Sequence, residues 1–137
     1  MSEENVETLR SGLNAWAQSG YGPETFQTAV FDPDIEWDVS DYPLPDWPNV
    51  GSGRERFQEL MRTYVSGWQD YRAEPRDLVD AQDEVVMALH ETVAMGGSAE
   101  TLERDLHQVW TFREGVVVKI RVFRTRTQAL EAAGLSE

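Results

Sequence analysis

The chain contains no cysteine, and this absence is the first constraint on what it can be. Without a thiol there is no disulfide, no thiolate nucleophile and no cysteine-ligated metal, so packing alone must hold the fold together. Long apolar runs are also missing, since no segment approaches the roughly 20 residues that span a bilayer. The N-terminus lacks the basic and apolar regions of a signal peptide. We therefore expect a cytoplasmic protein.

Basic residues are scarce as well. Twelve Lys and Arg residues stand against 25 Asp and Glu, which gives a formal net charge of -13 at neutral pH. Nucleic acid or an anionic membrane surface would repel such a chain, so we expect neither as a partner. A length of 137 residues with 40% hydrophobic residues predicts one globular domain over residues 1–137.

The most informative segment present runs from His107 to Phe123 and reads as two strands folded about Arg113-Glu114-Gly115. Alternation along the first strand creates two faces, which hold Leu106, Gln108, Trp110 and Phe112 on one side and His107, Val109 and Thr111 on the other. Both faces carry bulky groups, so both must be covered. We expect helices of the chain on one face, and a second copy or a ligand cavity on the other.

The remaining elements follow from periodicity and from breakers. Apolar residues at helical spacing predict helices over residues 2–18, about 23–31, 54–68 and 127–133. Strands are predicted over residues 35–39, 71–79 and 85–93, and Pro75 places its strand at an edge or at a bulge. Residues 95–98 read as a hairpin turn. The segment 40–53 reads as a loop, yet it carries Tyr42, Leu44 and Trp47, which suggests a lid or rim.

Three sequence features taken in order resemble a known family. They are FDPDIEW after two N-terminal helices, the Gly-x-Gly-Arg-Glu start of the third long helix, and VWTFREGVVVKIRVF near the C-terminus. Together they resemble SnoaL-like proteins of the nuclear transport factor 2-like superfamily, and the ALEAAGLSE ending is similar to small bacterial members. The resemblance covers nearly the whole chain.

The resemblance implies an α+β fold, a cone-shaped roll in which a strongly curved antiparallel sheet packs on three N-terminal helices around an internal cavity. It also implies a homodimer through the outer sheet face, and it implies no cofactor. Fold class alone does not give the reaction, because this superfamily includes ketosteroid isomerase, limonene epoxide hydrolase, polyketide cyclases and binding modules without catalysis.

Each catalytic branch can be compared with the chain residue by residue. Resemblance to ketosteroid isomerase would require a tyrosine, an aspartate base and a protonated aspartic acid at positions that hold Leu13, Val39 and Gln108. Only Gln108 could donate a hydrogen bond to a developing oxyanion. The hydrolase and cyclase branches place a carboxylate on the last strand, where this chain has Ile120 and Val122. None of these catalytic sets is reproduced.

Two carboxylates are the remaining candidates for a catalytic base. Asp38 is one residue from the expected base, but alternation turns it away from the face of Trp37 unless a bulge shifts the register. Glu91 shares a face with Leu89 that the resemblance directs into the cavity, where a carboxylate needs a partner or a proton. Arg124 could be that partner at the cavity mouth, and a salt bridge at the rim is the favoured interpretation of Glu91.

The two histidines, His90 and His107, fall on the face opposite the cavity and could meet across the sheet or at a dimer interface. With Asp105 or Asp38 they could suggest a metal site, but their spacing matches no metal motif, so we expect no metal.

Aromatic residues from several elements would converge on the cavity if the resemblance holds, although such residues are most often simply core. The side chains expected to bind a ligand are Leu13, Trp16, Trp37, Trp47, Phe57, Met61, Tyr64, Trp68, Leu89, Gln108, Trp110, Phe112, Ile120, Val122 and Arg124.

Three functions of different class stay open. The first is a pocket protein that binds a small, largely apolar or aromatic molecule. The second is a cofactor-independent isomerase, epoxide hydrolase or polyketide cyclase that uses Glu91 or Asp38 as base and Gln108 as donor. The third is a dimeric structural or partner-binding module whose cavity is filled by its own side chains.

Overall fold

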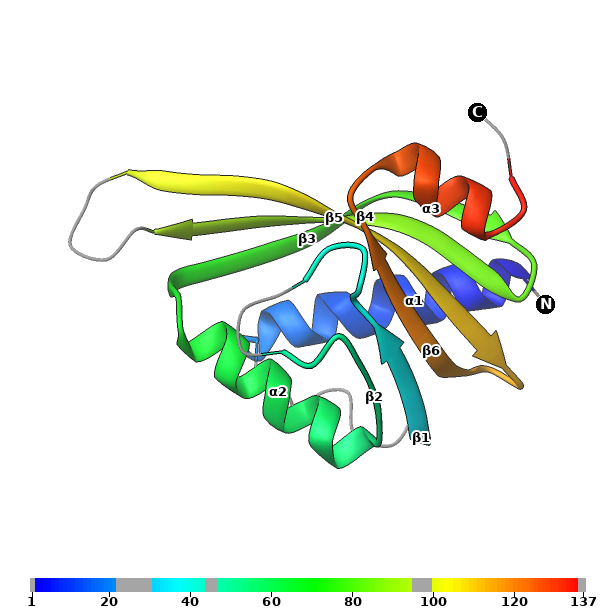
Figure 1. The fold of residues 1–137 in the computed structure, drawn as a ribbon, viewed down its shortest axis with the longest axis horizontal. Helices are drawn as coiled ribbons and strands as arrows, with labels where there is room; N and C mark the ends of the chain where they lie inside the picture. Colours follow the sequence, from blue (N-terminus) through cyan, green and yellow to red (C-terminus); the bar gives the residue numbers. More distant parts are fainter. Residues whose placement is uncertain (1, 22–30, 44–46, 95–99, 136–137) are drawn as a thin grey trace.

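A computed structural model of the chain describes residues 2–21, 31–43, 47–94 and 100–135. These residues form three helices and six strands (Figure 1). In chain order the elements are α1 (Ser2–Gln18), β1 (Phe31–Asp38), β2 (Val50–Ser52), α2 (Arg54–Ser66), β3 (Gln69–Ala81), β4 (Glu84–Ala94), β5 (Thr101–Arg113), β6 (Val116–Phe123) and α3 (Arg126–Ala132).

The strands form one curved, open sheet in the order β2-β1-β6-β5-β4-β3 (Figure 1). This confirms the predicted α+β roll. The neighbours in the sheet run antiparallel, apart from β1 and β6, which are parallel. The parallel pair arises because β1 enters the sheet from the helical half of the chain, whereas β3 to β6 follow one another through hairpins.

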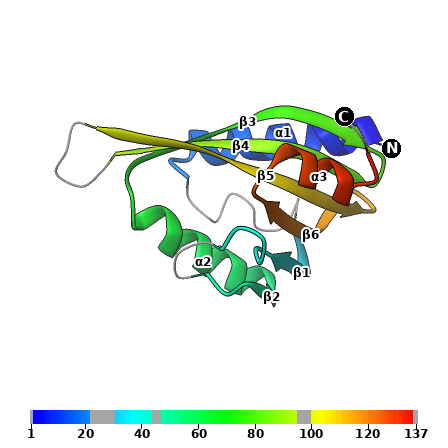
Figure 2. The same ribbon diagram turned by 45° about the horizontal axis from the view of Figure 1, so that its top comes forward.

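Helices cover both faces of the sheet (Figure 2). On the inner face, α1 contributes Leu9, Leu13 and Trp16 to the main core, and α2 contributes Phe57. These residues share one side of each helix, as their spacing predicts. On the outer face, Leu130 of α3 packs with neighbours on β4 and β5 in a smaller second core. The chain therefore covers part of its own outer sheet face, which we expected a second copy or a cavity to cover.

Local sequence explains how the strands are joined and shaped. Glu114 and Gly115 both have positive φ and form the two-residue turn between β5 and β6, a geometry that glycine accepts at no steric cost. Arg113 is the last residue of β5 and not part of the turn. Pro75 lies on β3, an edge strand, where its missing N–H is tolerated, and it pairs in register with Leu89 just before a register shift between Arg76 and Val79. This confirms the edge prediction.

Several predicted boundaries differ from the structure or lie outside the described residues. The segment predicted as loop 40–53 contains the short strand β2, whose three residues pair with the end of β1. The third predicted helix ends at Ser66, and Gly67 caps it before Trp68. The short helix predicted over residues 23–31 and the turn over residues 95–98 lie outside the described residues, apart from Phe31, which begins β1. The last helix begins at Arg126. Thr125 is its N-cap residue and forms a capping box with Gln128 in the first turn.

Candidate functional site

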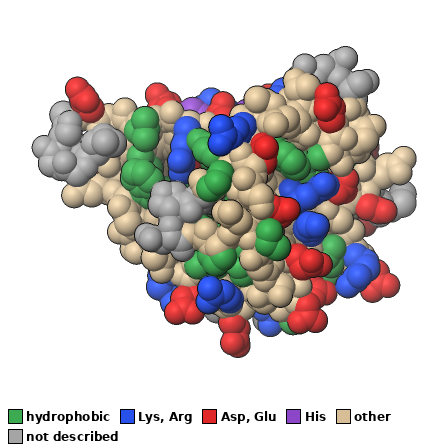
Figure 3. Space-filling model, in the orientation of Figure 1, with side chains coloured by type: hydrophobic (Ala, Val, Ile, Leu, Met, Phe, Trp, Pro, Cys, Tyr) green, Lys and Arg blue, Asp and Glu red, His purple; other side chains and the backbone are tan. Residues whose placement is uncertain are grey.

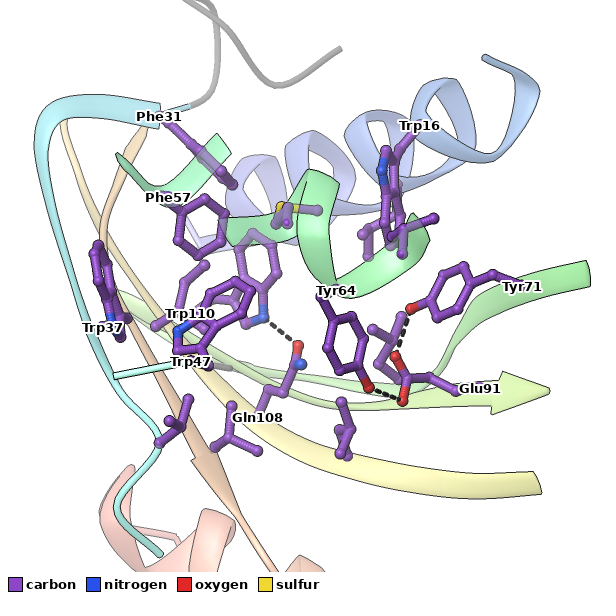
Figure 4. Close-up of a pocket in the computed structure, with 18 residues that line it drawn as sticks. Trp16, Phe31, Trp37, Trp47, Phe57, Tyr64, Tyr71, Glu91, Gln108 and Trp110 are labelled. Carbon is purple, nitrogen blue, oxygen red and sulfur yellow. Dashed lines mark hydrogen bonds between the residues drawn. The ribbon is translucent and has the colours of Figure 1, made fainter. Parts of the chain in front are cut away.

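A cavity lies between the inner sheet face, α1 and α2, and contains about 80 Å³ of free space (Figure 4). Its walls come from α1, β1, α2 and β3 to β6, together with Trp47, which precedes β2. The residues that line it are Leu13, Trp16, Phe31, Trp37, Val39, Trp47, Phe57, Met61, Tyr64, Val65, Tyr71, Leu89, Glu91, Leu106, Gln108, Trp110, Ile120 and Val122. The lining is apolar except for a few groups that lie toward one end.

Aromatic rings form the apolar end of the cavity. The Trp47 ring packs edge-on against Trp37 and Phe57, with ring centroids 6.2 and 5.5 Å apart. Trp37 is buried and donates its indole N–H to the Pro48 carbonyl, 3.1 Å away. Its ring lies directly against Gly51 of β2, where a Cβ atom would approach Trp37 to 2.3 Å. A side chain at position 51 therefore cannot coexist with this position of the indole ring.

The opposite end of the cavity is polar and is organised around Glu91, which is only 2% exposed. One carboxylate oxygen accepts hydrogen bonds from the Tyr64 hydroxyl at 2.8 Å and from Arg104 Nε at 2.9 Å. The other oxygen accepts from the Tyr71 hydroxyl at 2.5 Å. Figure 4 shows both tyrosines pointing at the carboxylate. Three donors thus satisfy a buried charge that would otherwise cost several kcal/mol.

The buried tyrosines stay protonated donors in this network. Burial, and then the neighbouring Glu91 carboxylate, raise the pKa of Tyr64 and of Tyr71 well above the usual range of a phenol. Burial alone would lower the pKa of Arg104, but Tyr64 and Glu91 together raise it, so the guanidinium keeps its charge. The polar end therefore holds one anion, one cation and two neutral hydroxyl groups.

Gln108 is the polar side chain of the cavity wall nearest the aromatic rings. It is buried, and its Oε1 accepts a hydrogen bond from Trp110 Nε1 at 2.7 Å (Figure 4). An indole N–H can only donate, so this bond fixes which end of the amide is the oxygen. Among the described residues Nε2 makes no hydrogen bond to another side chain or to the backbone, and it is not one of the fully buried unpaired nitrogen atoms. A donor is thus available inside an apolar wall.

Most residues predicted to bind a ligand do line the cavity. They are Leu13, Trp16, Trp37, Trp47, Phe57, Met61, Tyr64, Leu89, Gln108, Trp110, Ile120 and Val122, and Glu91 joins them. Val39 also lines it, so the positions compared with ketosteroid isomerase all face the cavity. Alternation explains this result for the strands. Once one side chain of a strand is known to face the cavity, every second residue of that strand faces it too.

Three predicted residues do not line the cavity. Trp68 follows the end of α2, and its ring lies beside the Arg104 guanidinium. Phe112 is core, because a register shift at Thr111 and Phe112 separates it from the cavity-facing row of β5. Arg124 was predicted to pair with Glu91, and this is wrong. Its backbone N–H and its Nε instead donate to Asp41 at 3.0 and 2.7 Å, beyond the end of β6.

Asp38 is turned away from the cavity, which is the direction that alternation predicts when no bulge shifts the register. Trp37 and Val39 face inward, and alternation sends the carboxylate between them to the other side. The register shift in β1 lies between Phe31 and Glu36 and does not reach Asp38. The Ser40 backbone N–H donates to this carboxylate at 2.9 Å and lowers the pKa of Asp38, which marks a turn-capping role.

On the outer face, His90 lies between Asp105 and Glu103, at 2.7 and 2.8 Å from their carboxylate oxygens. These hydrogen bonds, that to Asp105 first, raise the pKa of His90. Strand register places His107 opposite Ala88 and not opposite His90. Across the described ranges, no group of three or more acidic or histidine side chains is arranged to hold a metal ion.

The sequence interpretation missed Arg104 and Tyr71, which complete the polar end. Arg104 lies two residues before Leu106 on the same face of β5, so the alternation that places Leu106 and Gln108 also turns Arg104 toward Glu91, although Arg104 does not itself line the cavity. Tyr71 was assigned to a strand, but its side chain was not followed across to Glu91. To find these contacts, one would need to know which strands lie side by side in the sheet as well as the face on which each side chain lies.

The outside of the molecule carries mixed charges. Figure 3 shows acidic and basic side chains interspersed over the face seen in Figure 1, with hydrophobic side chains in small groups between them. None of the helices in the described ranges is long and apolar enough to cross a membrane.

Comparison with known proteins gives matches at the level of family and fold. A family model described as a SnoaL-like domain matches residues 13–120. A nuclear transport factor 2-like protein from Burkholderia xenovorans LB400 is 24% identical, with a TM-score of 0.69 and 97% of each chain covered. A putative SnoaL-like polyketide cyclase from Jannaschia sp. CCS1 is 19% identical, with a TM-score of 0.70 and coverage of 99% of this chain and 95% of that one.

A third solved structure, TerC co-crystallised with polyporic acid, is 20% identical, with a TM-score of 0.65 and coverage of 96% of this chain and 98% of that one. At these identities the solved structures show a shared fold alone. No curated protein matches the sequence.

Proposed function

We propose that this chain, which belongs to the SnoaL-like domain family, binds a small, largely apolar or aromatic molecule in its cavity. The observation that carries the proposal is the Gln108 amide, a donor without a protein partner that is held inside an apolar wall by Trp110. A ligand acceptor that bonds to this N–H group would contribute about 0.5 to 1.5 kcal/mol of binding free energy, the net worth of a neutral hydrogen bond. TerC, a structural relative, was crystallised with a small organic molecule, polyporic acid.

The chemistry of the wall defines the ligand further. Trp110 orients Gln108 so that N–H groups face the cavity, which favours a carbonyl or ether oxygen on the ligand. Trp47 Nε1 is a further donor without a partner among the described residues, and it is fully buried. The rings of Trp37, Trp47 and Phe57 provide flat apolar surfaces. The expected ligand is therefore uncharged, mostly apolar and equipped with at least one acceptor.

The cavity also limits ligand size. Ligand pockets commonly hold about 300 to 1,000 Å³, whereas this one contains about 80 Å³. A compound of one aromatic ring suits this volume. A larger polyketide or terpenoid would need Trp47 to move, and this residue lies outside the helices and strands and is only half-buried. Compounds of one ring are therefore the first to test.

An enzyme is the second candidate, because Glu91 lies in the cavity wall, as a catalytic base of an isomerase, hydrolase or cyclase would. The hydrogen bonds from Tyr64, Tyr71 and Arg104 occupy both of its oxygens, so it could accept a substrate proton only after one donor moves. Binding is therefore the function that the geometry supports better. Turnover of any bound compound, lost in Glu91→Gln, would reverse this preference.

The third candidate is a homodimer through the outer sheet face. The part of that face that α3 leaves open carries the charged residues Glu103, Asp105 and Arg76, so a dimer there would pair charges more than apolar groups. Sedimentation velocity at low and high salt tests it, since a dimer of this kind should weaken as salt rises. The dimer, the cytoplasmic location and the bacterial origin stay predictions.

A matched pair of probes tests the binding proposal. Acetophenone and ethylbenzene have similar shape, but only the ketone has a hydrogen-bond acceptor. We expect the wild type to bind acetophenone about 3 to 10 times more tightly, as measured by ligand-observed NMR or tryptophan fluorescence. Gln108→Leu should abolish this preference while ethylbenzene binding persists.

Gln58→Leu is the control, because Gln58 is on α2 but does not line the cavity. It should keep the wild-type preference. The proposal fails if neither probe binds the wild type, or if Gln108→Leu still prefers the ketone.

A further inference from the structure

The Arg104 guanidinium lies among three aromatic rings at the polar end of the cavity. Its central carbon is 5.9 Å from the ring centre of Tyr42 and 5.8 Å from those of Tyr64 and Trp68. All three distances fall within the roughly 6 Å over which a cation is attracted to a ring face. The same guanidinium donates to Glu91 and to the Tyr64 hydroxyl. One cation thus contacts an anion and three rings.

The groups around Arg104 belong to other parts of the chain. Tyr42 follows β1, Tyr64 lies on α2, Trp68 follows α2, and Glu91 lies on β4. We call these four residues the cage. Glu91 is also held by Tyr71, so its carboxylate keeps its place without the guanidinium. The cage is therefore built by the fold and not by Arg104, which enters it from β5.

We infer that the cage is a binding site for a small organic cation, a guanidinium or alkylammonium ion, and that Arg104 fills it as a ligand tethered to the chain. The inference goes beyond the proposed function, because it concerns the polar end of the cavity and not the Gln108 donor. It also explains why an external ligand should be uncharged. In the intact protein the cation site is already occupied.

The chemistry of the cage selects an organic cation over a metal ion. Divalent metal ions require several oxygen ligands, and within the described residues the guanidinium position is in hydrogen-bond contact with only two oxygen-bearing groups of the cage, the Glu91 carboxylate and the Tyr64 hydroxyl. A guanidinium ion is weakly hydrated, stacks on aromatic faces and donates in a plane. The Arg104 side chain is 23% exposed, so the site is in contact with solvent. A free cation could therefore reach the cage once Arg104 is shortened.

Removal of the tethered ligand tests the inference. Arg104→Ala leaves the cage with an unpaired carboxylate, which methylguanidinium can occupy. We expect methylguanidinium to raise the melting temperature of this variant by about 3 to 5 °C at a concentration about ten times its Kd. N-methylurea, which has nearly the same shape but no charge, should have no effect. The wild type should respond to neither compound.

Two further variants locate the effect. The double variant Arg104→Ala with Glu91→Leu lacks the anion of the cage and should lose the response. Arg76→Ala is the matched control, because Arg76 pairs with Glu74 on the exposed edge strand and no aromatic ring of the described residues lies over its guanidinium. It should not respond to methylguanidinium.

Each result decides the inference. If Arg104→Ala does not fold alone, a higher yield of folded protein on refolding with methylguanidinium than with N-methylurea supports it, and equal yields overturn it. Equal responses to the two compounds, or a response of the wild type or of Arg76→Ala, also overturn it. Loss of the ketone preference described above would leave these results unchanged, so the two proposals fail separately.

Discussion

Neighbouring residues on β4 place two ion-pair clusters in opposite environments. Glu91 points inward to Arg104, and His90 points outward between Asp105 and Glu103, so both clusters use the same pair of strands. The inner carboxylate is 2% exposed, whereas the outer carboxylates of Asp105 and Glu103 are 45% and 60% exposed. Similar contact distances therefore act in very different surroundings.

The comparison shows that distance alone does not tell what an ion pair contributes. Water screens the outer cluster, and pairs of that kind are worth about 0 to 1 kcal/mol. The Glu91 carboxylate was largely desolvated when the sheet folded over α2, so removal of its partner leaves a charge that water solvates poorly. We expect mutations on the two faces to differ in size and in pH dependence.

The largest effect should come from the inner cation. Arg104→Ala should lower the free energy of unfolding by about 3 to 5 kcal/mol, because it leaves the Glu91 carboxylate buried without its counter-charge. Urea denaturation measures this directly. Arg76→Ala, which breaks the exposed pair with Glu74, should cost less than about 1 kcal/mol. Equal losses in the two variants would contradict the contrast between the faces.

A smaller effect is expected for one inner hydroxyl. Tyr71→Phe keeps the ring and removes one donor to Glu91, so it should cost about 1.5 to 3 kcal/mol, the range for hydrogen bonds to charged groups. Tyr42→Phe is its control, since the Tyr42 ring faces Arg104 and its hydroxyl has no hydrogen bond within the described part of the chain. That variant should stay within about 0.5 kcal/mol of the wild type.

The smallest effect should come from the outer face and should depend on pH. The raised pKa of His90 means that the folded protein holds this proton more tightly than the unfolded chain does. The cluster therefore stabilises the fold below the ordinary histidine pKa of 6.5 and loses this contribution as pH rises through the folded pKa.

His90→Gln should melt below the wild type at about pH 6, and the gap should close by about pH 8. Thermal unfolding at both pH values measures it. A gap that is constant with pH would show that protonation of His90 does not contribute.

From the sequence one could predict on which face of the sheet a side chain lies, but not which side chain it would contact there. Alternation along β4 and β5 correctly directs Glu91 and Gln108 inward, because strand geometry offers only two faces. Arg124 was chosen as the partner of Glu91 on the same kind of argument, yet Arg104 holds that place. The choice between them depends on the register of β4 against β5, and no local pattern encodes that register.

The other misses have local causes. Trp68 was counted with the helix, but α2 ends at Ser66 and Gly67 caps it before Trp68. Phe112 was counted with the cavity row, but a bulge shifts the last residues of β5. Helix ends and bulges displace a side chain by one position, which is enough to move it from a cavity to the core.

The contact between Gly51 and Trp37 has a consequence for comparing relatives. Because no methyl group fits between the strand and the indole ring, a larger residue at position 51 requires a smaller or displaced ring at position 37. We expect these two positions to change together across the family. The residues at these two positions would then indicate how wide the aromatic end of the cavity is in members known only from their sequences.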